Sequence, residues 1–174
     1  GVIQAAEGNL GVILAGSRSA VERAKPFLKN FCGKMEYFGP IGMGATTKLT
    51  SNFLALGTAT LVIETLKLAQ KLDIDLQKFY DLACQGSGRS TSLDRIAKKA
   101  IKGDYKGYVF SIANTVKDLT YIHQLVTERN LELDDLISSI RRQYEDALAI
   151  GLGNSYISQM LDPSFGRQDA NKDI

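Results

Sequence analysis

The chain has 174 residues, of which 44% are hydrophobic and 23% charged, so it has ordinary globular proportions and the length of about one domain. Its 21 basic and 19 acidic residues nearly balance, and like charges never run beyond two residues, which argues against a basic patch for nucleic acid or an anionic membrane. Uninterrupted apolar stretches stay below the roughly 18 residues of a membrane span, so we expect a soluble protein.

Cysteine usage indicates the compartment. Cys32 and Cys84 stand apart, without a second cysteine or a histidine at metal-binding spacing. This pattern argues against a disulfide framework and a zinc site, and it favours a reducing compartment, either the cytoplasm or the mitochondrial matrix. The sequence begins without a methionine or a targeting signature, and we expect it to be the interior of a longer chain.

Two strands are expected in the first part of the chain. The segment 9–16, NLGVILAG, is a short apolar run that ends in glycine, and the segment 34–40, KMEYFGP, alternates apolar and polar residues. Between them Ser19 can cap a helix over 20–31, in which Pro26 must introduce a kink or mark the true start. Because two or three strands do not make a stable sheet, we expect this segment to complete a larger one.

Helical periods fill the interval between Pro40 and Pro163, which contains no proline. The longest predicted helix runs from Gly44 to about Leu72. Its apolar positions recur at three and four residues, namely Leu49, Phe53, Leu56, Thr60 and Ile63. Further helices are expected over 76–85, 90–102, 111–130 and 134–150, with a short helical turn near 155–161. Because the longest helix is apolar around most of its girth, it should be the buried central helix of a bundle.

We therefore predict a mainly α fold, a helical bundle built on one long central helix and preceded by a small strand–helix–strand segment. The predicted divisions are 1–41 for that segment, 42–162 for the all-helical domain and 163–174 for a polar tail. The central helix has more apolar surface than one small bundle can cover. We therefore expect a second copy to pack against it, in a homodimer or homotetramer.

The segment 39–53, GPIGMGATTKLTSNF, joins a glycine cluster to an apolar helix. Its outer glycines have the spacing of a phosphate loop, but Ala45 stands where that loop requires lysine, so the nucleotide-binding interpretation fails. Lys48 opposes the helix dipole, which prefers anions at this end. From spacing alone, Lys48 is a solvated surface lysine and Asn52 a polar residue at the edge of the apolar face.

Four stretches of the sequence belong to one pattern. They are GVIQAAEGNLGVILAG at 1–16, GPIGMGATTKLTSNF at 39–53, QGSGRS at 85–90 and GYVFSIANTVKDL at 107–119. Together they resemble the β-hydroxyacid dehydrogenases, the family of 3-hydroxyisobutyrate dehydrogenase and tartronate semialdehyde reductase. The second stretch is similar to the family's G-x-G-x-x-x-K-x-x-x-N signature, and the last to its F-x(6)-K-D-L helix. The first stretch is similar to the segment after the family's D-x-P-V-S-G-G motif, of which only Gly1 would be present.

The resemblance covers about residues 1–162 and implies a protein in two parts. An N-terminal Rossmann domain would bind NAD or NADP, and this chain would hold its last strands together with the helical C-terminal domain. The substrate would be a small 3-hydroxyacid or its semialdehyde, of the 3-hydroxyisobutyrate, tartronate semialdehyde or succinic semialdehyde type. The implied site residues are Lys48 and Asn52 for catalysis, Gly1, Gly42 and Gly44 for substrate, and Lys117 for the cofactor. Because the dinucleotide fingerprint is not in the sequence, we expect the chain to be inactive alone.

The chemistry of the residues fits these roles. Hydride reduction of an aldehyde leaves negative charge on oxygen, which a positioned ammonium can stabilise and protonate, while the neutral amine accepts the proton in reverse. Asn52 lies one helical turn after Lys48, so both can reach one bound molecule. Without side chains, Gly42 and Gly44 would let a substrate carboxylate or hydroxyl approach backbone N–H groups.

Structural explanations stand beside the functional ones. Lys117 lies at the margin of its helix's apolar stripe, where a lysine that extends into water is the plain interpretation. His123, the only histidine, lies on that stripe without a relay partner at a suggestive spacing, so we expect a structural role. Ser87 and Ser90 either face substrate or cap a helix. The alternative for the whole chain is a non-catalytic helical module for dimerisation or interaction, in which Lys48 is incidental.

Overall fold

The structure is a computed structural model in which residues 6–166 are described. It divides into two compact units, Gly1–Asn52 and Phe53–Ile174. The predicted substrate contact Gly1 lies outside the described residues.

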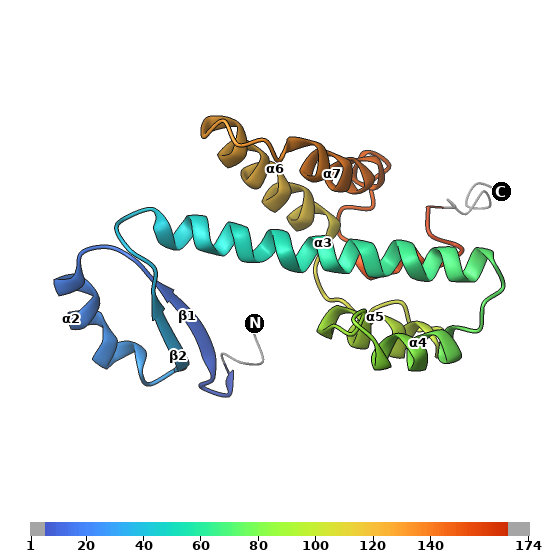
Figure 1. Ribbon diagram of the computed structural model, residues 1–174, viewed down its shortest axis with the longest axis horizontal. Coiled ribbons are helices and arrows are strands. Elements are labelled where there is room, and N and C mark those ends of the chain that lie inside the picture. The colour runs from blue at the N-terminus through green and yellow to red at the C-terminus, as the bar shows by residue number, and fades with distance from the viewer. Residues whose placement is uncertain (1–5, 167–174) are drawn as a thin grey trace, which may run out of the picture. The chain divides into compact units, whose positions relative to one another are not determined.

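The first unit is a parallel strand–helix–strand (Figure 1). Strand β1, Leu10–Leu14, pairs with β2, Cys32–Tyr37, in parallel, and helix α2, Arg18–Leu28, connects them. Gly11 is paired with Lys34 and Leu14 with Tyr37. The expected strand–helix–strand arrangement is therefore present in the sequence segment where we predicted it.

The cap of α2 differs from the prediction. Ser17, whose backbone is extended, caps the helix by accepting a hydrogen bond from the Ala20 N–H at 3.4 Å. The prediction that Ser19 caps the helix was wrong, because the chain already turns into the helix directly after Gly16. Pro26 lies inside the helix, near its end.

Helix α3, Met43–Lys71, has 29 residues and begins in the first unit and ends in the second. Of the predicted apolar positions, Leu56, Thr60 and Ile63 are buried, while Leu49 and Phe53 are half-buried. The helix is also long and apolar enough to cross a membrane by length and composition, although only 33% of its most apolar window is buried. The apolar stretches of α3 are interrupted by polar residues, so the helix meets this membrane-span criterion only when hydropathy is averaged over a window. The core helix of a soluble protein meets the same criterion.

Within its described residues, the second unit continues with four α-helices and one 3-10 helix. They are α4 (Leu76–Gln85), α5 (Thr91–Ala100), α6 (Ile112–Glu128), α7 (Asp134–Ala149) and η1 (Ile157–Leu161). Asp75, Ser90 and Ser111 cap α4, α5 and α6 by accepting backbone N–H groups with their side chains. Between residues 43 and 166, the only β-type pairing is an isolated antiparallel bridge between Ser111 and Tyr156. The mostly helical fold with a small parallel sheet is confirmed.

Helices α6 and α7 pack against each other as an antiparallel pair (Figure 1). The core of the unit includes residues from α3 and η1. The largest fully buried side chains of the unit are Ile63, Leu66, Ile96, Ile112, Leu119, Ile137, Tyr144, Ile157 and Leu161. A polar link joins α3 to α7 inside this core, because the hydroxyl groups of Thr60 and Tyr144 are 2.6 Å apart. Burial raises the pKa of Tyr144 to about 12.

Candidate active site

The start of α3 lies at the carboxyl end of the small parallel sheet. There the Gly16 N–H donates to the Gly39 carbonyl at 2.8 Å, and the Phe38 N–H donates to the Leu14 carbonyl at 2.8 Å. The chain then turns through Gly42, whose φ is 93°, into the helix. In open sheets of parallel strands, ligands bind outside the carboxyl ends of the strands, so this turn has a favourable position for a site.

The two candidate glycines have different local environments. A Cβ on Gly44 would lie 3.3 Å from the Cβ of Ala15, so the missing side chain lets the helix pack closely on the end of β1. A Cβ on Gly42 would meet nothing within 4 Å, but the positive φ favours glycine there. Packing therefore accounts for Gly44 and backbone conformation for Gly42. Open space beside Gly42 also leaves room for a bound molecule.

Lys48 and Asn52 form a pair one turn further along α3. The Lys48 ammonium donates to Asn52 Oδ1 at 2.6 Å. Lys48 is exposed and Asn52 half-buried, so within this unit the ammonium reaches solvent and the amide holds it in place. The arrangement orients the Lys48 ammonium near the start of α3. Because an ammonium carries three N–H groups, it can donate to a bound molecule as well as to Asn52.

Lys117 belongs to the second unit, on α6. Its side chain is 53% exposed, and its ammonium lies 3.1 Å from Oδ1 of Asp118. The Asp118 side chain is only 11% exposed, so the carboxylate lies within the packed face while the lysine extends outward. This geometry agrees with the margin position inferred from the sequence, and it leaves the ammonium accessible to an anionic group.

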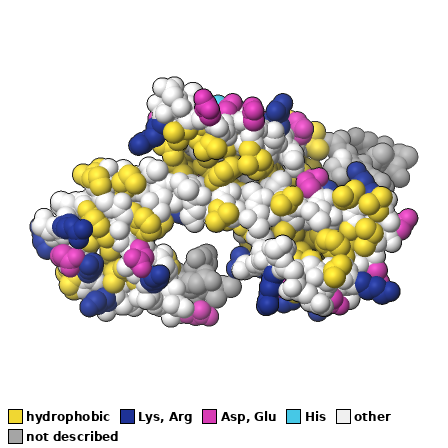
Figure 2. All heavy atoms as spheres, viewed as in Figure 1, with side chains coloured by type: hydrophobic (Ala, Val, Ile, Leu, Met, Phe, Trp, Pro, Cys, Tyr) yellow, Lys and Arg dark blue, Asp and Glu magenta, His cyan; other side chains and the backbone are white. Residues whose placement is uncertain are grey.

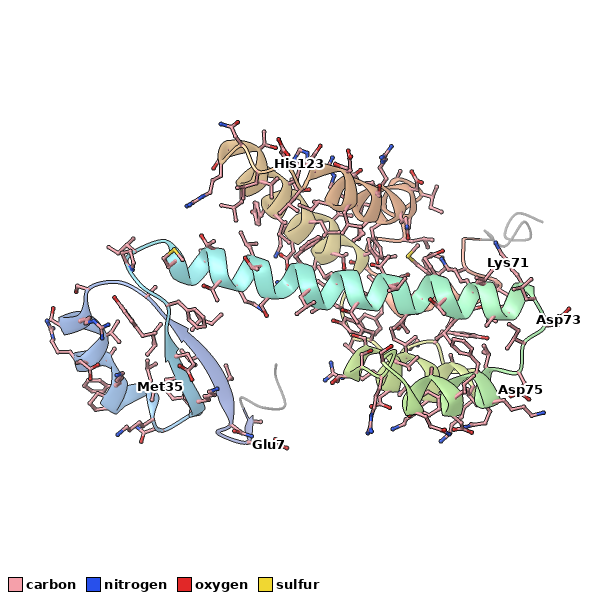
Figure 3. The ribbon with its side chains drawn as sticks, viewed as in Figure 1. Glu7, Met35, Lys71, Asp73, Asp75 and His123 are labelled. Atoms are coloured by element: carbon pink, nitrogen blue, oxygen red, sulfur yellow. The ribbon has the colours of Figure 1, made fainter. Side chains whose placement is uncertain are left out.

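His123 has a partner that the sequence did not suggest. Its Nε2 lies 2.7 Å from Oδ1 of Asp134 at the start of α7, so the pair ties α6 to α7. Figure 3 labels His123 on α6. The two residues are eleven positions apart on different helices, which is why spacing within one helix could not identify them. The Asp134 contact supports the expected structural role of His123.

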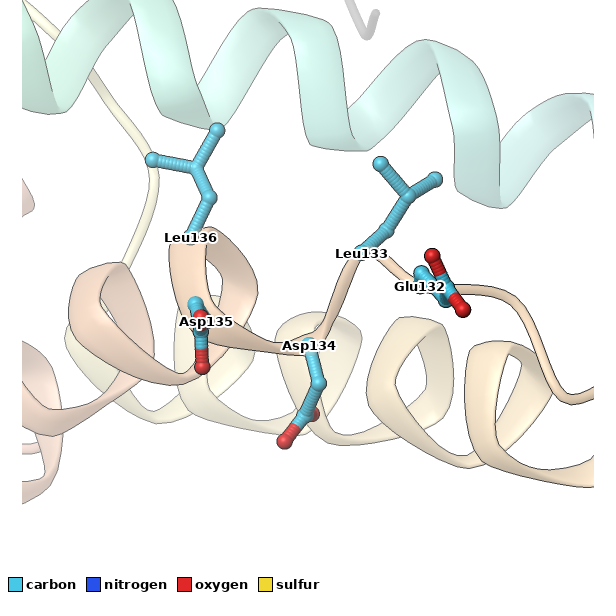
Figure 4. A pocket seen from close by; sticks show the side chains of 5 residues that line it. All are labelled: Glu132, Leu133, Asp134, Asp135 and Leu136. Carbon is cyan, nitrogen blue, oxygen red and sulfur yellow. The ribbon is translucent and has the colours of Figure 1, made fainter.

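An open hollow of ≈ 370 Å³ lies next to this pair, lined by residues 132–136 (Figure 4). Leu133 and Leu136 point in one direction, while the carboxylate of Asp134 points the opposite way (Figure 4). The hollow contains neither Lys48 nor Lys117. Its lining has carboxylates and apolar groups but no cation to bind the phosphates of a dinucleotide, so we do not assign it to the active site.

The turn with Ser87 and Ser90 has a structural function at Ser90, whose hydroxyl accepts the Leu93 N–H at 3.0 Å. Close to this turn, Tyr80 of α4 donates its hydroxyl to Asp94 of α5 at 2.5 Å. This hydrogen bond, followed by that of Lys98, holds the pKa of Asp94 below its usual value, and the same carboxylate raises the pKa of Tyr80. Among the described residues, no group of three or more His, Cys, Asp or Glu could hold a metal ion.

Residues 42–164 match the family model described as NAD-binding of NADP-dependent 3-hydroxyisobutyrate dehydrogenase. The chain therefore belongs to this family. An L-threonate dehydrogenase of Pectobacterium atrosepticum is 34% identical over 106 residues, which are 60% of this chain and 35% of that protein. An L-threonate dehydrogenase of Haemophilus influenzae is 29% identical over 162 residues, which are 92% of this chain and 53% of that protein.

A solved structure shows the same fold. The crystal structure of 3-hydroxyisobutyrate dehydrogenase from Salmonella typhimurium aligns with a TM-score of 0.81 and 25% identity, over 92% of this chain and 56% of that one. The resemblance to the β-hydroxyacid dehydrogenases is confirmed, and so is a nicotinamide dinucleotide as the cofactor of the family. The chain spans about half the length of the curated relatives that it matches over most of its own length.

Proposed function

We propose that this chain supplies the catalytic lysine of an NAD(P)-dependent oxidoreductase that acts on a small 3-hydroxyacid or its semialdehyde. The observation that carries the proposal is the Lys48–Asn52 pair, 2.6 Å apart at the start of α3, inside the region that matches the family. L-Threonate dehydrogenases and a 3-hydroxyisobutyrate dehydrogenase among the similar proteins support a small hydroxyacid as substrate.

In this proposal the nicotinamide cofactor, when bound, supplies or accepts the hydride. The Lys48 ammonium donates a proton to the substrate oxygen during reduction, and its neutral amine accepts that proton during oxidation. Asn52 orients the nitrogen through its Oδ1, and the N–H groups that begin α3 favour a negative charge nearby. The open space beside Gly42 would admit the substrate, and Gly44 keeps α3 close to β1.

We further propose that residues 1–41 complete a Rossmann-type cofactor domain and that 42–162 form the helical domain built on α3. Exposed aromatic residues support the first division, since Phe27 and Phe31 of the small unit are 73% and 47% exposed. Such side chains are usually covered, and further strands and helices of a larger sheet would cover them. In this arrangement Lys117 contacts the cofactor, and the chain alone is inactive.

The second candidate function is a non-catalytic dimerisation module. It is favoured by a leucine stripe that consists of three residues of α3 and the residue directly after it. Each of these leucines is more than half exposed: Leu54, Leu61, Leu68 and Leu72. We propose that this leucine stripe packs against a second copy in a homodimer or homotetramer, whether or not the chain also contributes to catalysis. The free thiols of Cys32 and Cys84 agree with a cytoplasmic or mitochondrial-matrix location.

Substitution of Lys48 in the full-length protein tests the catalytic proposal. We expect Lys48→Ala to lower kcat about 10²- to 10⁴-fold, because the general acid is lost, while cofactor affinity stays nearly unchanged. Lys48→Arg should restore little activity, because a guanidinium does not release its proton at working pH. Steady-state kinetics at pH 6–10 with several short 3-hydroxyacids would provide the measurement.

The matched control is Lys29→Ala, which removes an exposed lysine of the same unit away from the helix start. Asn52→Ala should raise KM if the amide positions substrate, or lower kcat as well if it orients Lys48. Near-normal turnover of a folded Lys48→Ala variant would refute the catalytic role and leave the dimerisation module as the better explanation.

A further inference from the structure

The loop before α6 is held by a segment that lies far along the chain. We call residues 104–111 the pre-α6 loop. Its Phe110 carbonyl accepts the Ile157 N–H at 3.0 Å, and directly after it the Ile112 N–H donates to the Ser155 carbonyl at 2.9 Å. The Ala113 N–H donates to the Gly153 carbonyl at 3.0 Å. The segment 153–158 therefore provides acceptors for N–H groups at the start of α6, which otherwise have no partner within the helix.

Ser158 provides the side-chain contact of this arrangement. It is 1% exposed, its Oγ accepts the Tyr108 N–H at 3.0 Å, and its hydroxyl donates to the Tyr105 carbonyl at 2.7 Å. One buried hydroxyl thus satisfies a donor and an acceptor of the pre-α6 loop. If the hydroxyl is removed, both backbone groups lose this partner, which costs more than the loss of an exposed hydrogen bond.

The loop also lies against α5. A Cβ on Gly107 would lie 2.2 Å from the carbonyl oxygen of Arg95, so the loop backbone lies directly against the helix backbone. The hydrogen bonds to Ser158 and the close approach to Arg95 both restrict the position of the loop. Ser111, which ends the loop, then caps α6 by accepting the Asn114 N–H at 3.3 Å.

We infer that Ser158 is a positioning residue for Lys117. The inference rests on the proposed cofactor contact of Lys117, which lies less than two turns after the Ser111 cap on the same helix. Lys117 and Asp118 move with the first turns of α6, and the position of those turns depends on the loop that Ser158 holds. A charged contact to a bound molecule weakens when the ammonium is displaced, because the attraction between two charges falls with the distance between them.

The test is a double-mutant cycle in the full-length protein, read by the KM of the cofactor. We expect Ser158→Ala to raise this KM about three- to tenfold with little change in kcat, because a displaced Lys117 loses part of its contact with the cofactor. This rise is the size expected for the loss of about one hydrogen bond. In a Lys117→Ala background, Ser158→Ala should cause no further rise, because the residue that it positions is already absent. A purely structural role would not produce this dependence on Lys117.

Two further variants complete the experiment. Ser158→Cys keeps a small side chain with a weaker hydrogen-bonding group, so its KM should lie between those of the wild type and Ser158→Ala, and it replaces Ser158→Ala in the cycle if the latter does not fold. Ser164→Ala is the control, because its hydroxyl makes only a local bond to Asp162 on the surface.

The outcomes separate this inference from the proposed function. If Lys117→Ala leaves the cofactor KM unchanged, the proposed role of Lys117 is refuted and the inference is refuted with it. If Lys117→Ala raises KM but a folded Ser158 variant does not, or raises it equally in both backgrounds, only the inference is refuted.

Discussion

Asp94 accepts the Tyr80 hydroxyl and lies 3.4 Å from the Lys98 ammonium, so its charge is stabilised by two neighbours. The hydrogen bond from Tyr80 is the larger cause of its lowered pKa. Because the pKa is lower in the folded than in the unfolded state, the stabilisation is present above the ordinary value of 3.8 and is lost as pH falls through the lower folded value. The pair therefore joins α4 to α5 at neutral pH and weakens in acid.

We expect Asp94→Asn to lower the thermal midpoint of unfolding at pH 7, and we expect the difference from the wild type to shrink as the pH is lowered below about 4. The difference should also shrink above about pH 10. There the unfolded state ionises its tyrosines while Tyr80, whose pKa the Asp94 carboxylate raises, stays protonated in the fold, so the stabilisation from this pair is lost as the pH rises. Thermal unfolding followed by circular dichroism from pH 3 to pH 11 provides the measurement. Asp146→Asn, on an exposed part of α7, is the control and should show no such pH dependence.

At the residue scale, the sequence indicates only neighbours within one helix. Lys48 and Asn52 are four residues apart, so helical geometry places them on one face, where the Lys48 ammonium donates a hydrogen bond to Asn52. His123 with Asp134 and Tyr80 with Asp94 join different helices, and their pairing depends on the angle at which those helices pack. Periodicity fixes which face of a helix is apolar, but it does not fix which polar residues meet across two helices.

At the scale of elements, the chain marks its helix boundaries clearly. Asp75 and Ser90 accept backbone N–H groups at helix starts, and Asn130 and Gly151 have positive φ after helix ends. These signals explain why the helices of the second unit were predicted with small errors. The error at Ser19 arose because two serines lie at the start of α2, Ser17 directly before it and Ser19 in its first turn, and the sequence alone does not tell which one has the extended backbone of a cap.

Gly107 has a packing requirement that the sequence pattern did not reveal. We expect Gly107→Ala to lower the free energy of unfolding by about 1–3 kcal/mol, because the new methyl group would overlap the Arg95 carbonyl and a backbone cannot rotate away as a side chain can. Chemical denaturation would measure the change. Gly86→Ala is the matched control, since a Cβ there meets nothing within 4 Å and φ is negative, and it should be neutral or slightly stabilising. Equal stability of the two variants would contradict the close approach.

At the scale of the whole molecule, the exposed apolar surface is the main feature that the packing within each unit does not explain. Hydrophobic side chains are visible on the surface of the second unit (Figure 2). The leucine stripe is exposed as well. Leu54, Leu61 and Leu68 are seven residues apart, which keeps them on one face of α3, and Leu72 follows directly after the helix ends. The sequence predicted that α3 is apolar on several sides, but it could not show which side the bundle covers.

Leu61, in the middle of the stripe, gives the test of association. We expect the chain to form a dimer or higher oligomer at micromolar concentration and Leu61→Asp to shift it toward the monomer, because a buried unpaired carboxylate would oppose the contact. Light scattering with size-exclusion chromatography would measure the mass. Asn154→Asp adds the same charge on an exposed loop and should leave the mass unchanged. A monomeric wild type would contradict the prediction.

The contact between Ser158 and the pre-α6 loop has a consequence for biosynthesis. The loop leaves the ribosome long before its partner, because Tyr108 and Ser158 are 50 residues apart. During translation α6 and α7 can pair first, while the start of α6 still lacks the hydroxyl and the carbonyls that complete it. The nascent unit therefore exposes the start of α6 without these partners until η1 has been synthesised. A chaperone or protease that recognises incomplete chains could bind during that interval.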